Sequence, residues 1–178
     1  MRKANKAIHD PAVIGQLLAT CPVGRLVTIG RDGFPMIKPL NFVFRDGKIY
    51  FHTALAGEKI DDIRCDNRVC FEVDLPLALV RAKTQPCEAS YLYRSVIIRG
   101  RAALVDDPAE RSLAFLGLME KYQPEGGYGD YLAEKLMITG IVAIAIEEMT
   151  GKEDLGQGER RARVLAALEQ GEALPLVL

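Results

Sequence analysis

The stretch between Lys48 and Asp74 constrains the fold more than any other part of the chain. Its first segment, Lys48–Thr53, is rich in aromatic and β-branched residues, which predicts a β-strand. Ala54–Gly57 is small and flexible, so the backbone there can approach a ligand closely. Glu58–Arg64 carries two isoleucines three residues apart, as on one face of a helix, and Val69–Val73 predicts a second strand. The stretch therefore predicts a strand, a loop, a short helix and a strand.

The same stretch contains the parts of an anion-binding site. Thr53 ends the strand with a hydroxyl, Lys59 adds a positive charge, and N–H groups in the first turn of a helix lack partners within it. The pattern is also typical of a turn before a helix with a solvated lysine, because Gly57-Glu58-Lys59 is not a Walker phosphate loop. Spacing alone leaves both interpretations open.

The rest of the chain predicts further short strands. Gly24–Ile29 and Pro35–Phe44 flank an Asp-Gly turn, and a second Asp-Gly turn leads into the strand at Lys48, which together predict an antiparallel meander. Ala89–Val105 predicts a long strand in which Gly100 marks a bulge, and Thr139–Glu147 predicts a buried closing strand. Leu75–Glu88 contains two prolines and predicts an irregular loop, part of which extends the preceding strand.

Four helices are expected around these strands. Asp10-Pro11 and Asp107-Pro108 are helix starts, with the aspartate as cap and the proline in the first turn, and Glu110 stands at the capping-box position of the second. These helices are predicted to end near Thr20 and Tyr122, and two more are predicted at 131–136 and 159–169. About six antiparallel strands with peripheral helices fit a small closed barrel, an α+β fold dominated by β.

Composition describes an ordinary globular chain. With 178 residues, 49% hydrophobic and 26% charged, it suits one domain with a single core. A net charge of −1 argues against a nucleic-acid partner. The chain has no run of 18 apolar residues and no signal-peptide core, so we expect a cytoplasmic protein without a membrane partner.

The four cysteines do not form a zinc pattern. Cys65 and Cys70 have four residues between them, and neither a second close pair nor a neighbouring histidine completes a site. We therefore expect no metal and four reduced thiols, with Cys70 in a strand core.

Two longer motifs carry a resemblance to a known family. They are N-F-V-F-R-D-G-K-I-Y-F-H-T-A-x-x-G-E-K at Asn41–Lys59 and Y-x-Y-R-S-V-I-I-R-G-R at Tyr91–Arg101. Across roughly residues 10–150 the chain resembles the FMN-binding split-barrel flavoproteins. Within them it is most similar to the pyridoxamine 5′-phosphate oxidase-related group that includes the nitroimidazole-resistance (Nim-type) proteins.

The resemblance implies a six-stranded antiparallel split β-barrel with peripheral helices. It implies a single FMN-binding domain over residues 1–178, with a core at about 10–150 and a C-terminal helical extension at 151–178. Members of the family are homodimers with FMN in clefts between the subunits, so the cofactor expected here is FMN and the partner expected is a second copy of the chain.

The resemblance also implies which residues hold the FMN phosphate. Thr53 and Lys59 map to the hydroxyl and the basic residue that grip it, flanked by His52, Ala54 and Gly57. The better-known oxidases have Ser-Arg-Lys where this chain has Gly-Glu-Lys, so one of two cations is missing. Either Arg94 replaces that cation or the phosphate depends more on backbone N–H groups.

Arg94 and Ser95 match the second family motif, whose polar residue meets the phosphate or the ribityl chain. An arginine there could hold a phosphate through a bidentate fork. The alternative is that Arg94, like Arg99, is an outward-facing strand arginine.

Lys38, Pro39, Leu40 and Asn41 align with the strand along the isoalloxazine ring. Their backbone groups would meet the polar edge of the ring, and Lys38 would favour negative charge on the reduced flavin. Lys38 could equally be a plain surface lysine. His52 is a candidate catalytic proton donor beside the flavin, or a hydrogen-bonded histidine that shapes the phosphate loop.

The function implied is an FMN-dependent oxidoreductase that reduces a small electrophile such as a nitroaromatic. The chain has no tryptophan, and its C-terminus lacks the basic segment with which true pyridoxamine phosphate oxidases bind their substrate, so that activity is not expected. Two alternatives stay open: a non-catalytic FMN store or redox sensor, and a haem-binding split barrel with His52 or His9 as ligand.

Overall fold

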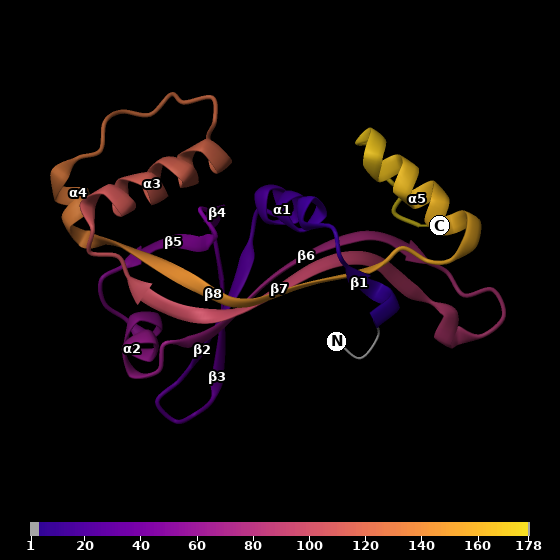
Figure 1. The fold of residues 1–178 in the computed structure, drawn as a ribbon, viewed down its shortest axis with the longest axis horizontal. Coiled ribbons are helices and arrows are strands. Elements are labelled where there is room, and N and C mark those ends of the chain that lie inside the picture. Colours follow the sequence, from indigo (N-terminus) through magenta and orange to yellow (C-terminus); the bar gives the residue numbers. More distant parts are fainter. Residues whose placement is uncertain (1–3, 178) are drawn as a thin grey trace. The chain divides into compact units, whose positions relative to one another are not determined.

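The fold is that of a computed structural model, which describes residues 4–177 (Figure 1). The chain forms two compact units. The large unit comprises Leu18–Val73 and Ile97–Met149, and the small unit comprises residues 4–17, 74–96 and 150–177. The expectation of a single domain over the whole chain stays a prediction.

The structure is mainly sheet, with five α-helices and eight strands among the described residues. The strands are β1 (Ala7–Ile8), β2 (Gly24–Ile29), β3 (Pro35–Leu40), β4 (Val43–Arg45), β5 (Lys48–Ala54), β6 (Arg68–Val80), β7 (Ser90–Leu104) and β8 (Thr139–Asp154). The helices are α1 (Pro11–Thr20), α2 (Glu58–Cys65), α3 (Pro108–Tyr122), α4 (Ala133–Ile138) and α5 (Gly158–Gln170), with short 3₁₀ turns at Ala4–Lys6 and Pro86–Glu88.

The sheet differs from the predicted six-stranded closed barrel. Its strand order is β3-β2-β6-β7-β8-β5-β4, a path of seven strands whose ends are not hydrogen-bonded to each other in the part of the chain that the structure describes, and β1 pairs with β8 as the eighth strand. The α+β class, dominated by antiparallel β, is confirmed.

The predicted strand Pro35–Phe44 is two strands that belong to opposite ends of this path. β3 pairs with β2, and β4 pairs with β5, which pairs onward with β8. The break occurs because the backbone N–H of Phe42 donates to the Tyr122 hydroxyl at 2.9 Å, and that hydroxyl donates to a backbone carbonyl. A side chain thus replaces the ladder bonds of one residue. Both antiparallel pairings of the predicted meander are confirmed, but its middle strand is two strands rather than one.

Two strands are longer than predicted. β6 continues through Pro76 to Val80, where an irregular loop had been expected, and only residues 81–85 before the 3₁₀ turn are irregular. β8 continues to Asp154, so the polar tether predicted at 151–158 shrinks to residues 155–157. Gly151 allows this extension, since a Cβ there would lie 2.9 Å from the Ile8 side chain on β1.

One core cluster of the large unit lies between the sheet and α3. Val43, Tyr50 and Ile141 from the strands pack against Ala114 and Leu118 of the helix. Figure 1 shows α3 and α2 on opposite sides of the strands β5 and β8. Asp107 caps α3 as predicted, because its carboxylate accepts from the Glu110 N–H at 2.7 Å. The second hydrogen bond of a capping box would join the Glu110 carboxylate to the Asp107 N–H, but that carboxylate contacts β5 instead.

The carboxylate of Glu110 accepts hydrogen bonds from Lys48 Nζ and the Tyr50 hydroxyl, each at 2.7 Å. These contacts hold the pKa of Glu110 below its usual value. They tie the start of α3 to β5, in addition to the cap that Asp107 provides.

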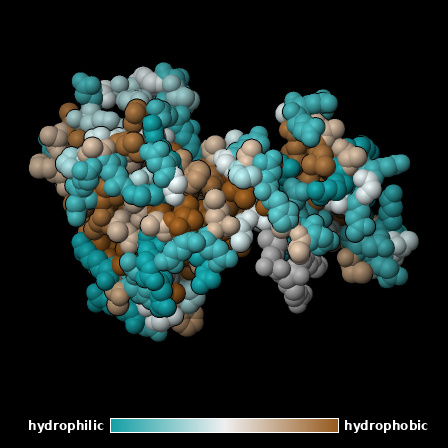
Figure 2. All heavy atoms as spheres, in the orientation of Figure 1, coloured by the Kyte–Doolittle hydropathy of each residue, from teal (hydrophilic) through white to brown (hydrophobic). Residues whose placement is uncertain are grey.

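The small unit has its own apolar cluster. Val80 and Leu92 of β6 and β7 pack with Leu155 and with Val164 of α5, and three further leucines of the C-terminal region cover them. Figure 2 shows apolar residues gathered beneath the polar outer surface of α5. Asp10 caps α1 as predicted, accepting from the Ala12 N–H at 2.8 Å.

The structure shows the surroundings of Gly100 and Cys70, for which the sequence made specific predictions. A Cβ on Gly100 would lie 2.2 Å from the carbonyl oxygen of Ala145, so this glycine permits close approach of β7 and β8, and the bulge expected there stays a prediction. Cys70 is exposed, because the residues on either side of it, Val69 and Phe71, take the buried face of β6. All four cysteines are free thiols.

β3 lies at one end of the sheet path, and none of its residues is fully buried. Pro35, Ile37 and Pro39 are all exposed and alternate along the strand. None of the described helices is long and apolar enough to cross a membrane.

Candidate functional site

A buried polar cluster lies where β2, β3 and α2 meet. Asp62 of α2 accepts from the Thr28 hydroxyl of β2 at 2.6 Å and from Lys38 Nζ of β3 at 3.1 Å. Lys38 also donates to Thr28 Oγ1 at 3.0 Å and lies 3.5 Å from the Glu58 carboxylate. Lys38 is therefore fixed by three partners, and its alternative as a plain surface lysine does not hold.

The charge state of this cluster follows from its contacts. Thr28 is fully buried and Asp62 is 3% exposed. Burial by itself raises the pKa of Asp62, but the hydrogen bonds from Thr28 and Lys38 and the charges of Lys38 and Arg31 outweigh it and hold that pKa below its usual value. Asp62 is thus a buried carboxylate that faces a lysine ammonium.

Lys59 brings a second ammonium to the same region. Its Nζ lies 5.2 Å from the centre of the Phe51 ring, and the side chain is partly buried. Burial lowers the pKa of Lys59, and the positive charge of Lys38 lowers it further. An anion beside Lys59 would therefore stabilise its charged form.

The loop before α2 presents backbone donors next to Lys59. The Gly57 carbonyl accepts from Ile60 N–H at 2.9 Å and Asp61 N–H at 3.0 Å, and we find no partner for the N–H groups of Glu58 and Lys59 among residues 4–177. Gly57 has a φ of 117°, a backbone conformation that residues other than glycine rarely adopt. The loop thus exposes two amides at the start of a helix.

The residues of β5 predicted to flank the phosphate lie at its end. Thr53 is half-buried, and His52 and Ala54 are exposed. His52, Thr53 and Ala54 pair in register with Ile141, Gly140 and Thr139 of β8. We find no side-chain partner for His52 in the described chain, so its imidazole is free to meet a ligand or a proton.

The other residues that were predicted to line the isoalloxazine ring directly follow Lys38 in the chain. Pro39 is exposed and Leu40 is half-buried on β3, and Asn41 is exposed just beyond the strand. The large unit thus contains Lys38–Asn41, the end of β5 and Lys59. Their contact with FMN stays a prediction.

Arg94 and Ser95 belong to the small unit. Arg94 is 8% exposed, and its Nε donates to the Glu153 carboxylate at 3.1 Å. Arg161 of α5 donates to the other oxygen of Glu153 at 2.7 Å. The outward-facing alternative is therefore wrong for Arg94 and right for Arg99, which is exposed beside Glu148. The ion pair gives Arg94 a structural role, and its role toward FMN stays a prediction.

The two described pockets do not include the predicted cofactor residues. One lies in the small unit along α5, and the other lies between α2 and the end of β7. No group of three or more histidine, cysteine or acidic residues among the described ones could hold a metal ion.

Sequence reasoning missed Thr28 and Asp62. One signal was present: Asp62 stands between Ile60 and Ile63, on the helix face that the isoleucines bury. A carboxylate on a buried face needs a partner. The identity of that partner depends on strand register, which the sequence does not reveal.

Several solved structures share the fold. A candidate 5-nitroimidazole antibiotic resistance protein from Bacteroides thetaiotaomicron superposes with a TM-score of 0.72 at 24% identity, over 83% of this chain and 86% of that one. The flavocytochrome Anf3 from Azotobacter vinelandii gives 0.74 at 22% identity, over 92% and 77%. An FAD and haem binding protein from Mycobacterium smegmatis gives 0.75 at 20% identity, over 91% and 80%.

A search of curated proteins finds no match. The sequence model of the family described as pyridoxamine 5′-phosphate oxidase matches residues 10–153, which include both motifs and the Lys38–Asp62 cluster. That match spans most of the chain and agrees with the split-barrel structures. The chain therefore belongs to the pyridoxamine 5′-phosphate oxidase family.

Proposed function

We propose that this protein is an FMN-dependent oxidoreductase that reduces a small electrophile such as a nitroaromatic. The observation that carries the proposal is the ammonium group of Lys59, whose pKa is lowered by burial and by the charge of Lys38, beside a loop whose first helical amides have no partner that we find among residues 4–177. The carboxylates of Asp62 and Glu58 lie beside Lys38, so a phosphate ester would supply the negative charge that faces Lys59.

The residues present fit a flavin monophosphate. Lys59 Nζ, the Thr53 hydroxyl and the N–H groups of Glu58 and Lys59 would hold the phosphate, since all are donors. The Glu58 carboxylate opposes an anion, but it lies 3.5 Å from Lys38 Nζ, which offsets part of its charge. A single phosphate matches this small donor set, so FMN is favoured over a dinucleotide flavin.

The bound flavin would supply the electron-transfer chemistry, and residues of the chain would set its reduction potential. Lys38, fixed by Asp62 and Thr28, would place a positive charge beside the ring and favour its reduced, anionic form. His52, with an unoccupied imidazole, would donate a proton to the substrate.

A homodimer with FMN between the subunits is part of the proposal. It is supported by apolar side chains left on the surface of the large unit, among them Phe34 at 70% and Ile37 at 66% exposed on and beside β3. Sedimentation of the protein with and without FMN tests this part, and a monomer in both conditions would refute it.

The main experiment is an absorption spectrum of the purified protein before and after FMN is added and removed by desalting. We expect retained flavin bands, a titration that saturates at one FMN per chain, and oxidation of a reduced nicotinamide when a nitroaromatic is present. Retained flavin without turnover would instead support a store or redox sensor. No uptake of FMN or FAD would refute the flavin assignment.

Haem binding is the second candidate, because two structures with this fold are named as a flavocytochrome and an FAD and haem binding protein. Exposed His52 is the residue that could serve as an axial ligand. A Soret band that His52→Ala abolishes would favour this function, whereas its absence after haem is added would exclude it.

A further inference from the structure

The small unit contains a large groove that the proposed function does not use. Its volume is about 1310 Å³, and it is lined by α5, the facing ends of β6 and β7, and the C-terminal segment. That segment is held beside β6, because Leu79 N–H donates to the Leu176 carbonyl at 2.9 Å. Small-molecule sites are roughly 300–1,000 Å³, so the groove has room for a ligand with both a head and a body.

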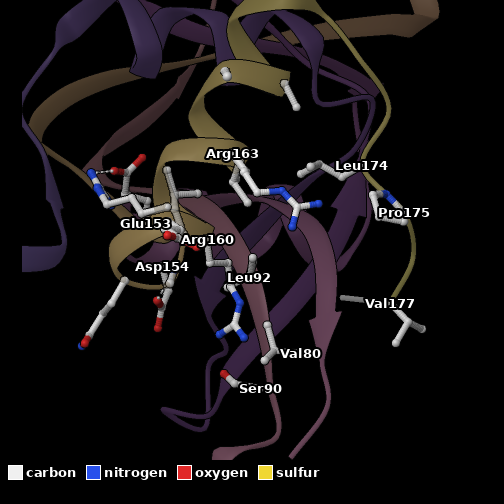
Figure 3. A pocket seen from close by; sticks show the side chains of 18 of the residues that line it. Val80, Ser90, Leu92, Glu153, Asp154, Arg160, Arg163, Leu174, Pro175 and Val177 are labelled. Atoms are coloured by element: carbon white, nitrogen blue, oxygen red, sulfur yellow. Dashed lines mark hydrogen bonds and ion pairs between the residues drawn. The ribbon is translucent and has the colours of Figure 1, made fainter.

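Part of the groove is apolar. Val80 and Leu92 from the strands and Val164 from α5 line it, and all three belong to the buried cluster of this unit. Leu174 and Val177 of the C-terminal segment add further apolar surface. Figure 3 shows Val80 and Leu92 together on the strands that face α5.

Two arginines on one face of α5 also line the groove. Arg160 and Arg163 are three residues apart, and Figure 3 shows both projecting from the helix. The stem of Arg160 packs on Gly156, where a Cβ would lie 2.8 Å from its Cδ. Neither guanidinium has a hydrogen-bond or ion-pair partner that we can identify among residues 4–177.

Two carboxylates of the groove are already in ion pairs. Glu153 accepts from both Arg94 and Arg161, and Asp154 is bonded to Lys6.

Glu88 accepts from the Thr84 hydroxyl at 2.6 Å. Glu159 and Glu172 also line the groove, and we find no hydrogen-bond or ion-pair partner for either within residues 4–177. Lys83 adds a third basic side chain to the two arginines. The lining contains five basic and five acidic side chains, so the groove as a whole is neutral, but the guanidinium groups of Arg160 and Arg163 lie together on one face of α5.

We propose that this groove binds an amphipathic organic anion, with its carboxylate or phosphate head on Arg160 and Arg163 and its apolar body against Leu174 and Val177. A guanidinium binds either head through two parallel hydrogen bonds. The apolar residues select against small inorganic anions, which gain nothing from them.

The test is calorimetric titration of the full-length protein with octanoate and octyl phosphate, using 1-octanol and inorganic phosphate as controls. We expect one or both amphipathic anions to bind at least about tenfold more tightly than either control, since each control lacks one of the two contacts. Preference between octanoate and octyl phosphate identifies the head group. Equal affinity for an anion and 1-octanol, or for octyl phosphate and inorganic phosphate, would overturn the proposal.

Variants locate the binding. Arg160→Gln combined with Arg163→Gln should weaken the tighter anion at least about tenfold while leaving 1-octanol unchanged. Ala167→Trp, which fills the groove without changing charge, should weaken both. Arg99→Gln is the matched control, because it removes an exposed arginine of the large unit. Unchanged affinity in the double variant, or equal loss in the control, would refute the assignment.

Discussion

Asp62→Asn removes the negative charge that faces Lys38, and we expect it to lower the free energy of unfolding by about 2–4 kcal/mol. Removing one partner of a buried ion pair typically costs about 3–5 kcal/mol, because the other charge stays buried. The side chain of Lys38 is 18% exposed and also reaches Glu58, which reduces that cost. Asparagine can still accept a hydrogen bond from Thr28, which reduces it further.

The measurement is urea unfolding followed by circular dichroism, with the change read from the midpoint at constant slope. Asp61→Asn is the matched control, since Asp61 precedes Asp62 on the same helix and we find no partner for it within residues 4–177. We expect it to cost less than about 1 kcal/mol, the usual effect of a charge near a helix N-terminus.

A double-mutant cycle with Lys38→Met separates the pair from general packing. In the Lys38→Met background, Asp62→Asn should cost at least about 1 kcal/mol less than in the wild type. If the cost is the same in both backgrounds, or if Asp62→Asn and Asp61→Asn are equivalent, the ion pair does not hold α2 on the sheet.

The pH dependence of this effect has a definite sign. The folded protein lowers the pKa of Asp62, so its contribution is complete above the unfolded value of about 3.9 and is lost as the pH falls through the lower folded pKa. The difference in unfolding free energy between wild type and Asp62→Asn should therefore be constant from about pH 5 to about pH 7, a range that begins about one unit above the unfolded pKa. Below the unfolded pKa the difference should shrink. A difference that grows in acid would contradict the argument.

Three further predictions concern other charges. Lys59→Ala should weaken FMN binding by about 1–3 kcal/mol in a fluorescence titration, and an unchanged dissociation constant would remove Lys59 from the phosphate site. Arg94→Ala should lower the free energy of unfolding by about 3 kcal/mol, because it leaves Glu153 with one partner, and an unchanged melting transition with weaker FMN binding would instead favour a cofactor role. Burial lowers the pKa of Lys121 to about 8, although its position 3.5 Å over the Phe42 ring favours the ammonium. Wild-type stability should therefore rise with pH above about 8 relative to Lys121→Met, and parallel profiles would refute the shift.

Local chemistry explains what the sequence predicted well. The caps at Asp10 and Asp107 act within three residues, so both helices could be recognised without knowledge of the fold. The same holds for β2, whose limits at Gly24 and Ile29 match the prediction, since turn residues follow it directly.

The errors share a different cause, which is contact between distant residues. The strand predicted at Pro35–Phe44 is divided by Tyr122, 80 positions away from Phe42 in the chain. Glu110 had the right spacing for a capping box, but Lys48 and Tyr50 take its carboxylate.

The candidate site likewise contains residues that local motifs predict and residues whose roles depend on distant contacts. Lys38 and Lys59 were predicted from the family motifs and lie in one region, whereas the roles of Thr28 and Asp62 depend on a register that brings three elements together. Arg94 was predicted from its motif, but its ion pair depends on β8 continuing past Met149 to Glu153.

The alternation of Pro35, Ile37 and Pro39 on β3 has a consequence for how copies of this protein can meet. In a strand, alternate residues direct their N–H groups to the same side, and edge prolines stand where the missing N–H faces away from the neighbouring strand. The outer edge of β3 then keeps one amide, that of Ile37, where three would otherwise be available to template another strand. A neighbouring molecule can therefore bind this edge through side chains but cannot extend the sheet across it, which allows specific assembly and resists fibre growth.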